Sequence, residues 1–301
     1  MWQYLRKMLI LVVIAVIAII PCEFLIRTMK DNPYSYKHSY IVENGERITE
    51  LILGSSHSYY GVSPRFFNSS AFNLGSVSQP LRYDYELLKE YKQYMPNLRS
   101  VILDVSYFSL RATGLRKMES AGYNINYKLY MDADIDCSFI CNFAISSPSY
   151  FQGKMSAYVR SVVEKLSCDS LGWGMGYDLE GRSNEWDDAN AAILRHTNEE
   201  TTYLAQNKAA LHNIAKFCID NSVELIVITT PTWHTYYDNV DEVQYREMQG
   251  VVNELRSDFD IRYFDFFKDS RFVADDFYDS DHLSDVGAEK FTKILADTLA
   301  L

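Results

Sequence analysis

The chain has 301 residues, enough for one large α/β domain or two small ones. Its formal net charge of −11 argues against nucleic acid or an anionic surface as the main partner, because binding to phosphates needs clustered lysine and arginine. The 23 tyrosines suit wet, half-buried surfaces, including those that face sugars, but composition alone does not assign that role.

A charged start followed by an apolar run predicts an N-terminal membrane anchor. Arg6 and Lys7 precede an uncharged stretch that reaches Pro21, and the apolar pattern continues to Ile26 with one interruption at Glu23. The run totals about 19 residues, close to the ~20 that cross a bilayer. Because no clean small-residue cleavage site follows, an uncleaved signal anchor is favoured over a cleaved signal peptide.

Basic residues on the two sides of this segment bear on its orientation. Those before it favour a cytoplasmic start, whereas Arg27 and Lys30 lie on the other side and oppose that orientation. We expect a single-pass membrane protein with an anchor at residues 1–30 and a polar, tyrosine-bearing stalk at 31–47. The body is then expected outside the cytoplasm, in a periplasm or on the outer face.

The five cysteines fit such a compartment. Cys22 lies in the anchor, and Cys218 lies on the apolar face of an expected helix, where it serves packing. Cys137, Cys141 and Cys168 fall in one region and could include a disulfide. The spacing of the first two has no matching histidine or cysteine pair nearby, so we expect no zinc site, and we expect no other metal or cofactor.

Short apolar strands alternate with helices from residue 48 onwards. The expected strands are 48–54, 71–75, 100–106, 223–231 and 261–267, and the expected helices are 81–95, 203–220, 240–256 and 284–301, the last with Ser284 as its N-cap. This alternation predicts a flavodoxin-like three-layer α/β sandwich with a five-stranded parallel sheet. Ligands of such sheets bind outside the carboxyl ends of the strands.

A long insertion, at about 107–200, leaves the carboxyl end of the third strand and is expected to lie over this edge as a flexible cap. It contains three alternating glycines between residues 171 and 181. They neither follow a strand nor open a helix, which argues against a phosphate-binding loop.

Two polar segments at opposite ends of the sequence suggest nucleophilic catalysis. The first strand runs into "GSSHS", where Ser56 alone would more often cap a helix than react. Asp279 and His282 lie three residues apart just before the final helix. A serine hydrolase needs a base within hydrogen-bond reach of its nucleophile and an acid that orients the base. The final loop of a doubly wound sheet can reach the end of its first strand, so we expect Ser56, His282 and Asp279 to form a catalytic set.

These segments resemble the SGNH/GDSL hydrolase superfamily: "LGSSHS" after the first strand, "NLG" after the second and "DSDHLSDVGA" before the last helix. The resemblance covers about residues 48–301, without the insertion. It implies Ser56 as nucleophile, Asp279 and His282 as the terminal pair, and Gly75 as the glycine of the second block.

The serine at position 55, where the family has aspartate, and the membrane anchor resemble branches that act on cell-envelope polymers. These are the alginate-type O-acetyltransferases and the teichoic-acid D-alanyl transfer protein. The asparagine that the third block normally supplies to the oxyanion hole has no match in "VILDVSYFSL". The resemblance therefore implies an oxyanion hole from Ser56 and Gly75, with Ser106 or a cap residue in place of the asparagine. One missing donor can cost on the order of 10²–10³ in rate.

Other polar and aromatic residues near the strand ends have two interpretations each. His57 either supports the catalytic residues from behind or belongs to the surface, and it is also a candidate for contact with substrate. Trp233 and His234 follow the fourth strand and either bind a sugar ring or pack under the cap. Asp104 is expected to make a structural hydrogen bond to the first loop, and the family spacing disfavours Asp281 as the orienting acid. Three histidines have no identifiable partner in the sequence: His38, His196 and His212.

The expected function is acyl-ester hydrolysis or O-acyl transfer on an envelope or exported glycan through an acyl-enzyme on Ser56. Its partners would be an acylated glycan or acyl donor and a multi-spanning membrane acyltransferase. The alternative is an SGNH-like scaffold with little or no catalysis that binds glycan or organises a polysaccharide export or modification complex. A third class, a phosphate-binding domain, is excluded because "GSSHS" is not a glycine-rich loop.

Overall fold

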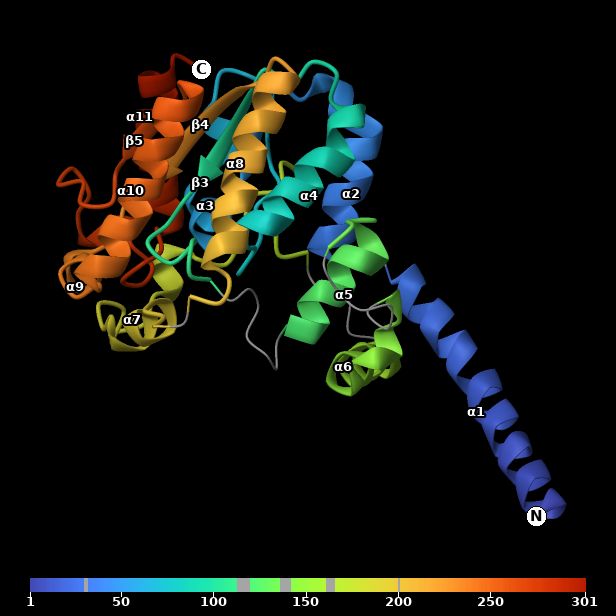
Figure 1. The fold of residues 1–301 in the computed structure, drawn as a ribbon. Helices are drawn as coiled ribbons and strands as arrows, with labels where there is room; N and C mark the ends of the chain where they lie inside the picture. Colours follow the sequence, from blue (N-terminus) through green and yellow to red (C-terminus); the bar gives the residue numbers. More distant parts are fainter. Residues whose placement is uncertain (30–31, 113–119, 136–141, 161–165, 200) are drawn as a thin grey trace. The chain divides into compact units, whose positions relative to one another are not determined.

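The computed structural model spans residues 1–301 and describes all of them except 30–31, 113–119, 136–141, 161–165 and 200. The chain forms two compact units (Figure 1). The N-terminal unit contains Met1–His38 and Arg116–Leu166, and the sheet unit contains Ser39–Leu115 and Ser167–Leu301.

The sheet unit contains five parallel strands. They are β1 (Glu50–Leu53), β2 (Ala71–Asn73), β3 (Ser100–Asp104), β4 (Glu224–Thr229) and β5 (Arg262–Asp265), in the spatial order β2-β1-β3-β4-β5. This is the flavodoxin-like order, and it confirms the predicted α/β sheet. The strands end one or two residues before the predicted limits, which leaves their polar carboxyl ends in loops.

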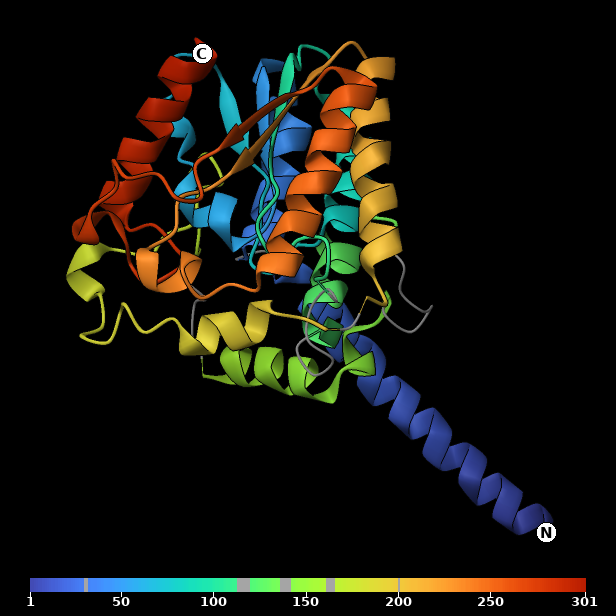
Figure 2. The same cartoon turned by 60° about the vertical axis from the view of Figure 1, so that its left-hand side comes forward.

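Helices cover both faces of this sheet, and the strands β1, β2 and β3 are buried throughout as a result. On one face, α11 (Asp285–Leu299) contributes Phe291 and Leu295 to a core with Ile52, Ile102 and Ile226. On the other face lie α4 (Leu81–Tyr91), α8 (Leu204–Asp220) and α10 (Glu242–Phe259). Figure 2 shows the strands between the red α11 and the orange and gold α10 and α8.

The remaining helices of the sheet unit are short, and one helix start follows the prediction. They are α3 (Ser56–Gly61), α7 (Asn190–His196) and α9 (His234–Tyr237), with 3₁₀ turns at Gly45–Arg47, Pro64–Phe66, Lys92–Tyr94, Leu179–Gly181 and Ala274–Asp276. Ser284 is the N-cap of α11, as predicted, since its Oγ accepts the N–H of Gly287 (3.2 Å).

The predicted cap insertion at about 107–200 is divided between the two units. Arg116–Leu166 belongs to the N-terminal unit, where it forms α5 (Ser120–Tyr130), a 3₁₀ turn (Ala144–Ser146) and α6 (Pro148–Val159). Residues 167–200 belong to the sheet unit. The sequence shows where a segment leaves a sheet, but not which core takes up its apolar side chains.

The segment 31–47 is not the polar stalk that the sequence predicts. Most of it forms the helix α2 (Pro33–Asn44), which packs against other parts of the protein. In the N-terminal unit, the buried Tyr34 ring meets Tyr127 edge-on at 5.1 Å between centroids. In the sheet unit, Tyr40 stacks on Phe72 at 4.5 Å. The tyrosines that made the segment look solvated therefore bury their rings in packing.

The N-terminal helix α1 (Trp2–Thr28) is long and apolar enough to cross a membrane, with a mean hydropathy of 3.0 over 18 residues. Its last turns pack within the N-terminal unit. The buried Glu23 carboxylate accepts the N–H groups of Ala144 (2.9 Å) and Ile145 (3.2 Å) and pairs with Arg27 (3.2 Å). These contacts explain a carboxylate inside an otherwise apolar run.

We expect Glu23→Ala to destabilise the N-terminal unit, because two backbone donors lose their acceptor, at a cost of about 1–3 kcal/mol. The measurement is hydrogen exchange of the segment that contains Ala144 in the detergent-solubilised chain. Asp134→Ala is the matched control, since the Asp134 side chain is 95% exposed and its ion pair with Lys128 is worth little. Equal protection in both variants would contradict the assignment.

Candidate active site

A tight turn after β1 presents Ser56 at the carboxyl edge of the sheet. Gly54 has a φ of +124°, which side-chain-bearing residues rarely adopt, and a Cβ there would lie 2.9 Å from the Cβ of Asp104. Its N–H donates to Oδ1 of the fully buried Asp84 (2.9 Å). Held in this way, the chain bends directly into α3, of which the half-buried Ser56 is the first residue.

The loop before α11 brings the predicted base and acid to this serine. His282 Nε2 lies 2.8 Å from Ser56 Oγ, and His282 Nδ1 lies 2.9 Å and 3.1 Å from the two carboxylate oxygens of Asp279. Asp279 Oδ1 also accepts the backbone N–H of His282 (2.8 Å), so the Asp-x-x-His turn is fastened by its own acid. Nucleophile, base and orienting acid therefore have the distances that acyl transfer through a serine requires.

Two carboxylates set the charge of His282. Burial lowers its pKa, but Asp279 and then Asp281 outweigh burial and raise the pKa to about 9. The pKa of Asp281 is itself lowered in spite of complete burial, since His282, His57 and His196 surround it. His282 is thus an imidazolium at neutral pH and must lose its proton before it can act as a base.

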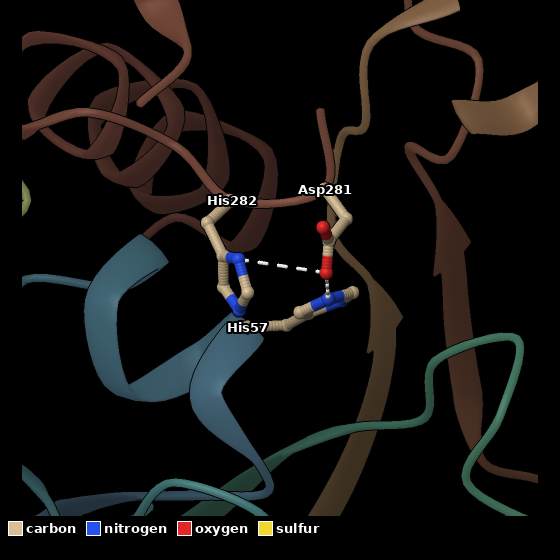
Figure 3. A group of neighbouring side chains, drawn as sticks. All are labelled: His57, Asp281 and His282. Atoms are coloured by element: carbon tan, nitrogen blue, oxygen red, sulfur yellow. Dashed lines mark hydrogen bonds and ion pairs between the residues drawn. The ribbon is translucent and has the colours of Figure 1, made fainter. Parts of the chain in front are cut away.

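A buried chain of hydrogen bonds lies behind His282. Asp281 Oδ2 is 3.5 Å from His282 Nδ1 and 3.2 Å from His57 Nε2, as Figure 3 shows. On its other side, His57 Nδ1 lies 2.8 Å from Ser106 Oγ, which is 2.7 Å from Asp104 Oδ2. None of the four residues behind His282 is more than 3% exposed.

This chain overturns two predicted roles. His57 is not placed to contact substrate, because it is buried and both of its ring nitrogens have partners inside the protein. Ser106 is not placed as an oxyanion donor, because its N–H donates to Ser109 Oγ (2.9 Å) and its hydroxyl is taken by Asp104 and His57. Asp104 bonds to Ser106 at the end of its own strand, and its Cβ crowds the first loop.

The other two predicted oxyanion donors, Ser56 and Gly75, differ in whether their backbone N–H already has an acceptor. Ser56 is the first residue of α3, a position whose N–H has no acceptor within the helix. The N–H of Gly75 instead donates to Asn73 Oδ1 (2.9 Å). Asn73 Nδ2 in turn donates to the carbonyls of Ser58 (2.8 Å) and Val62 (2.9 Å). A Cβ on Gly75 would lie 2.8 Å from Ser58 Oγ, so this glycine serves close packing of two turns.

Trp233 and His234 follow β4 as predicted, but the tryptophan is tied into packing. Its ring contacts Trp186 (5.3 Å between centroids) and Phe277 (5.4 Å), and its backbone N–H donates to the carbonyl of Ser280 (3.0 Å). Trp233 therefore supports the loop that carries Asp279 and His282 rather than presenting a face to a sugar. His234 is exposed at the start of α9.

A stack of tyrosines borders the base. Tyr177 lies between Tyr60 (3.8 Å between centroids) and Tyr278 (4.2 Å), and its edge meets the ring of His282 at 5.2 Å. The carbonyl of Tyr177 accepts the N–H of Asp285 (2.9 Å). Residues 171–181, predicted to be a flexible cap, thus lie fastened beside the site.

His196 is a neighbour of the site that the sequence did not identify. Its Nδ1 lies 2.7 Å from the hydroxyl of Tyr236 and 3.8 Å from Asp281 Oδ2, and burial lowers its pKa to about 3, so it is neutral. His38 lies on α2, and His212 Nδ1 is 3.0 Å from the carbonyl of Lys208.

No cysteine in the described part of the chain is among the residues of this site. Cys168 and Cys218 are buried, and burial raises the pKa of the Cys218 thiol to about 12. Cys137 and Cys141, the other two residues of the predicted disulfide region, lie outside the described residues.

The donor atoms of His57, Asp281 and His282 lie within 4.8 Å of one another, close enough to suggest a metal centre (Figure 3). An imidazole must offer a lone pair to bind a metal. Here His282 Nδ1 faces two carboxylates, and both nitrogens of His57 are in hydrogen bonds, so protons account for the arrangement.

Comparison with known proteins adds no family: no protein-family model matches the chain, and no curated protein matches its sequence.

The reactivity of Ser56 toward a serine-directed electrophile should rise with pH through about 9, because only neutral His282 can take the serine proton. The same pKa shift from 6.5 means that the proton on His282 stabilises the fold fully below pH 6.5, and that this stabilisation disappears as the pH rises through about 9. Labelling rates and melting temperatures between pH 6 and 10 test both effects. A rate that is already constant above pH 7 would refute the assignment of the proton.

We expect a chelator to leave the labelling rate of Ser56 unchanged, since protons fill the positions that a metal would need. The measurement compares labelling before and after EDTA treatment, with added Zn²⁺ as a further arm. Loss with EDTA and recovery with Zn²⁺ would show that His57, Asp281 and His282 are ligands after all.

Proposed function

We propose that the chain is a membrane-anchored serine acyltransferase or acylesterase related to the SGNH/GDSL hydrolases, acting on an envelope or exported glycan. The observation that carries the proposal is the set of hydrogen bonds from Ser56 through His282 to Asp279 at the carboxyl edge of a parallel sheet. An apolar N-terminal helix supports anchoring at a membrane. The body would lie outside the cytoplasm, where an acylated glycan would be met.

The reaction would proceed in two steps. Neutral His282 takes the proton of Ser56 Oγ as the oxygen attacks an ester or thioester carbonyl, and Asp279 supports the imidazolium that forms. His282 then protonates the leaving group, and the acyl group remains on Ser56. In the second step His282 takes a proton from water or from a sugar hydroxyl, which attacks the acyl-enzyme and releases Ser56.

The oxyanion of each tetrahedral intermediate needs backbone donors. The N–H of Ser56 would supply one. The N–H of Gly75 would supply a second only after it leaves Asn73 Oδ1, its acceptor at rest. This makes substrate binding part of the assembly of the site. A multi-spanning membrane acyltransferase is the kind of partner that could deliver an acyl group to it.

The backbone N–H groups of Gly75 and Ser106 already donate to side chains within the protein. This favours one alternative, an SGNH-like scaffold with little or no catalysis. Such a protein would bind glycan or organise an export or modification complex. It would keep the fold and lack a reactive serine.

Intact-mass analysis of the full-length chain in detergent, after treatment with a fluorophosphonate probe, separates the two. A catalytic protein should gain one adduct, which Ser56→Ala abolishes and His282→Ala slows by about 10²–10⁴-fold through loss of the base. Ser183→Ala, at an exposed serine, is the matched control and should label normally.

Absence of any adduct on the folded chain between pH 6 and 10 would refute the enzyme and favour the scaffold. For a chain that labels, 4-nitrophenyl acetate with and without cellotetraose distinguishes hydrolysis from transfer. Transfer requires that the sugar gain an acetyl group.

A further inference from the structure

The hydrogen bonds behind His282 connect three parts of the sheet unit. Asp104 and Ser106 end β3 and begin its loop, His57 lies in the first turn of α3, and Asp281 lies in the loop before α11. Three contacts join them in sequence, at 2.7 Å, 2.8 Å and 3.2 Å. Because all four side chains are almost completely buried, each contact needs its own proton.

Three placements of these protons satisfy all three contacts, and two of them leave Asp281 ionised. In the first, His57 is an imidazolium that donates to Asp281 and to Ser106, and Ser106 donates to ionised Asp104. In the second, protonated Asp104 donates to Ser106, Ser106 donates to Nδ1 of neutral His57, and His57 Nε2 donates to Asp281. In the third, protonated Asp281 donates to Nε2 of neutral His57, His57 Nδ1 donates to Ser106, and Ser106 donates to ionised Asp104. The His282 ring, whose Nδ1 lies 3.5 Å from Asp281 Oδ2, disfavours this third placement, since it lowers the pKa of Asp281. Each placement holds three protons and a net charge of −1, and Asp281 is the ionised end of the chain in the first two.

We propose that Asp281 is a second anionic positioning residue for His282, and that Asp104, Ser106 and His57 keep it ionised by sharing one proton among them. The role rests on the proposed function in so far as His282 is the base. The geometry itself stands on the distances: Asp281 Oδ2 faces the rings of both His57 and His282 (Figure 3).

The surroundings of His282 agree with this assignment. Of the charged groups that face it, Asp279 and Asp281 raise its pKa and Arg195 of α7 lowers it. The remaining polar or titratable neighbours are Ser56, His57 and Tyr60 of α3, Tyr177, Tyr278, and His196 of α7. Burial raises the pKa of Asp104, against the opposing effects of His57 and Ser106, which favours the shared proton at that end of the chain.

Asp281 would act differently from Asp279. Asp279 accepts the Nδ1 proton directly and so fixes the ring orientation, whereas Asp281 contributes charge from 3.5 Å. In each proton transfer the new imidazolium would then face two carboxylates. The consequence is a stronger base that is less available at neutral pH.

The test is a pH titration of the full-length, detergent-solubilised chain labelled with ¹⁵N-histidine, followed by NMR, with probe labelling on the same samples. The chain has six histidines, so single variants assign their signals. We expect Asp281→Asn to lower the pKa of His282 by about one unit or more, a tenfold change in its acid dissociation constant. Asp279→Asn should abolish most labelling, because Nδ1 loses its anionic acceptor and the amide that replaces it no longer stabilises the imidazolium.

Variants of His57 provide the conservative rescue. His57→Leu removes the donor to Asp281, so Asp281 should take up a proton and the pKa of His282 should fall as in Asp281→Asn. His57→Gln keeps an N–H donor toward Asp281 and should restore most of the wild-type pKa of His282. His212→Gln is the control and should change nothing. If Asp281→Asn does not fold, Ser106→Ala serves, with a smaller shift expected.

The outcomes separate the two proposals. A His282 pKa that stays at its wild-type value in Asp281→Asn, or in Ser106→Ala where the former does not fold, would overturn the role of Asp281. A chain that shows the shift in pKa but never labels would refute the proposed function and leave the coupling of Asp281 to His282 supported.

Discussion

The structure of the site depends on one hydrogen bond, between Ser56 and His282, whose residues are 226 positions apart. The bond forms because β1 is an inner strand of the sheet and the last loop returns to the same carboxyl edge before α11 packs on the sheet. Gly54 and Gly75 permit the turns to approach so closely, since a Cβ on either would lie within 3 Å of neighbouring atoms. The packing of the whole sheet unit therefore determines the distance between the two groups.

Charge is the second constraint. His282 is buried, which disfavours its protonated form, yet two carboxylates reverse that preference. The conditions that stabilise the fold, with His282 protonated, are those in which Ser56 lacks an available base. A site of this kind is least reactive where it is most stable, and substrate binding that displaces charge or water would change that balance.

The tyrosine stack and the loop after β4 hold the loop of Asp279 and His282 in place without taking part in proton transfer. Tyr177 is held between Tyr60 and Tyr278, and Trp233 donates to Ser280 within the loop of the base. Tyr177 and His196, from the second half of the predicted insertion, therefore border the site. Glu23 plays the corresponding part in the N-terminal unit, where it joins the end of α1 to the turn at Ala144–Ser146.

The sequence by itself determined the sheet, the apolar N-terminal helix and the group of Ser56, Asp279 and His282. Apolar runs alternating with amphipathic helices specify a parallel sheet, and three-residue spacing places Asp279 within reach of His282 through a single turn. These are local signals, which periodicity and spacing express directly.

Only the tertiary structure decided how the remaining polar groups pair. His57 meets Asp281 across 224 residues, and no pattern in the sequence marks that pair. The backbone N–H groups of Ser106 and Gly75 lie in the expected loops. Because the side chains of Ser109 and Asn73 point toward them, these N–H groups donate to Ser109 Oγ and Asn73 Oδ1 instead. Likewise, α2 has a polar sequence but packs the rings of Tyr34 and Tyr40 against other aromatic side chains. The burial of a helix depends on which core lies beside it and not on composition alone.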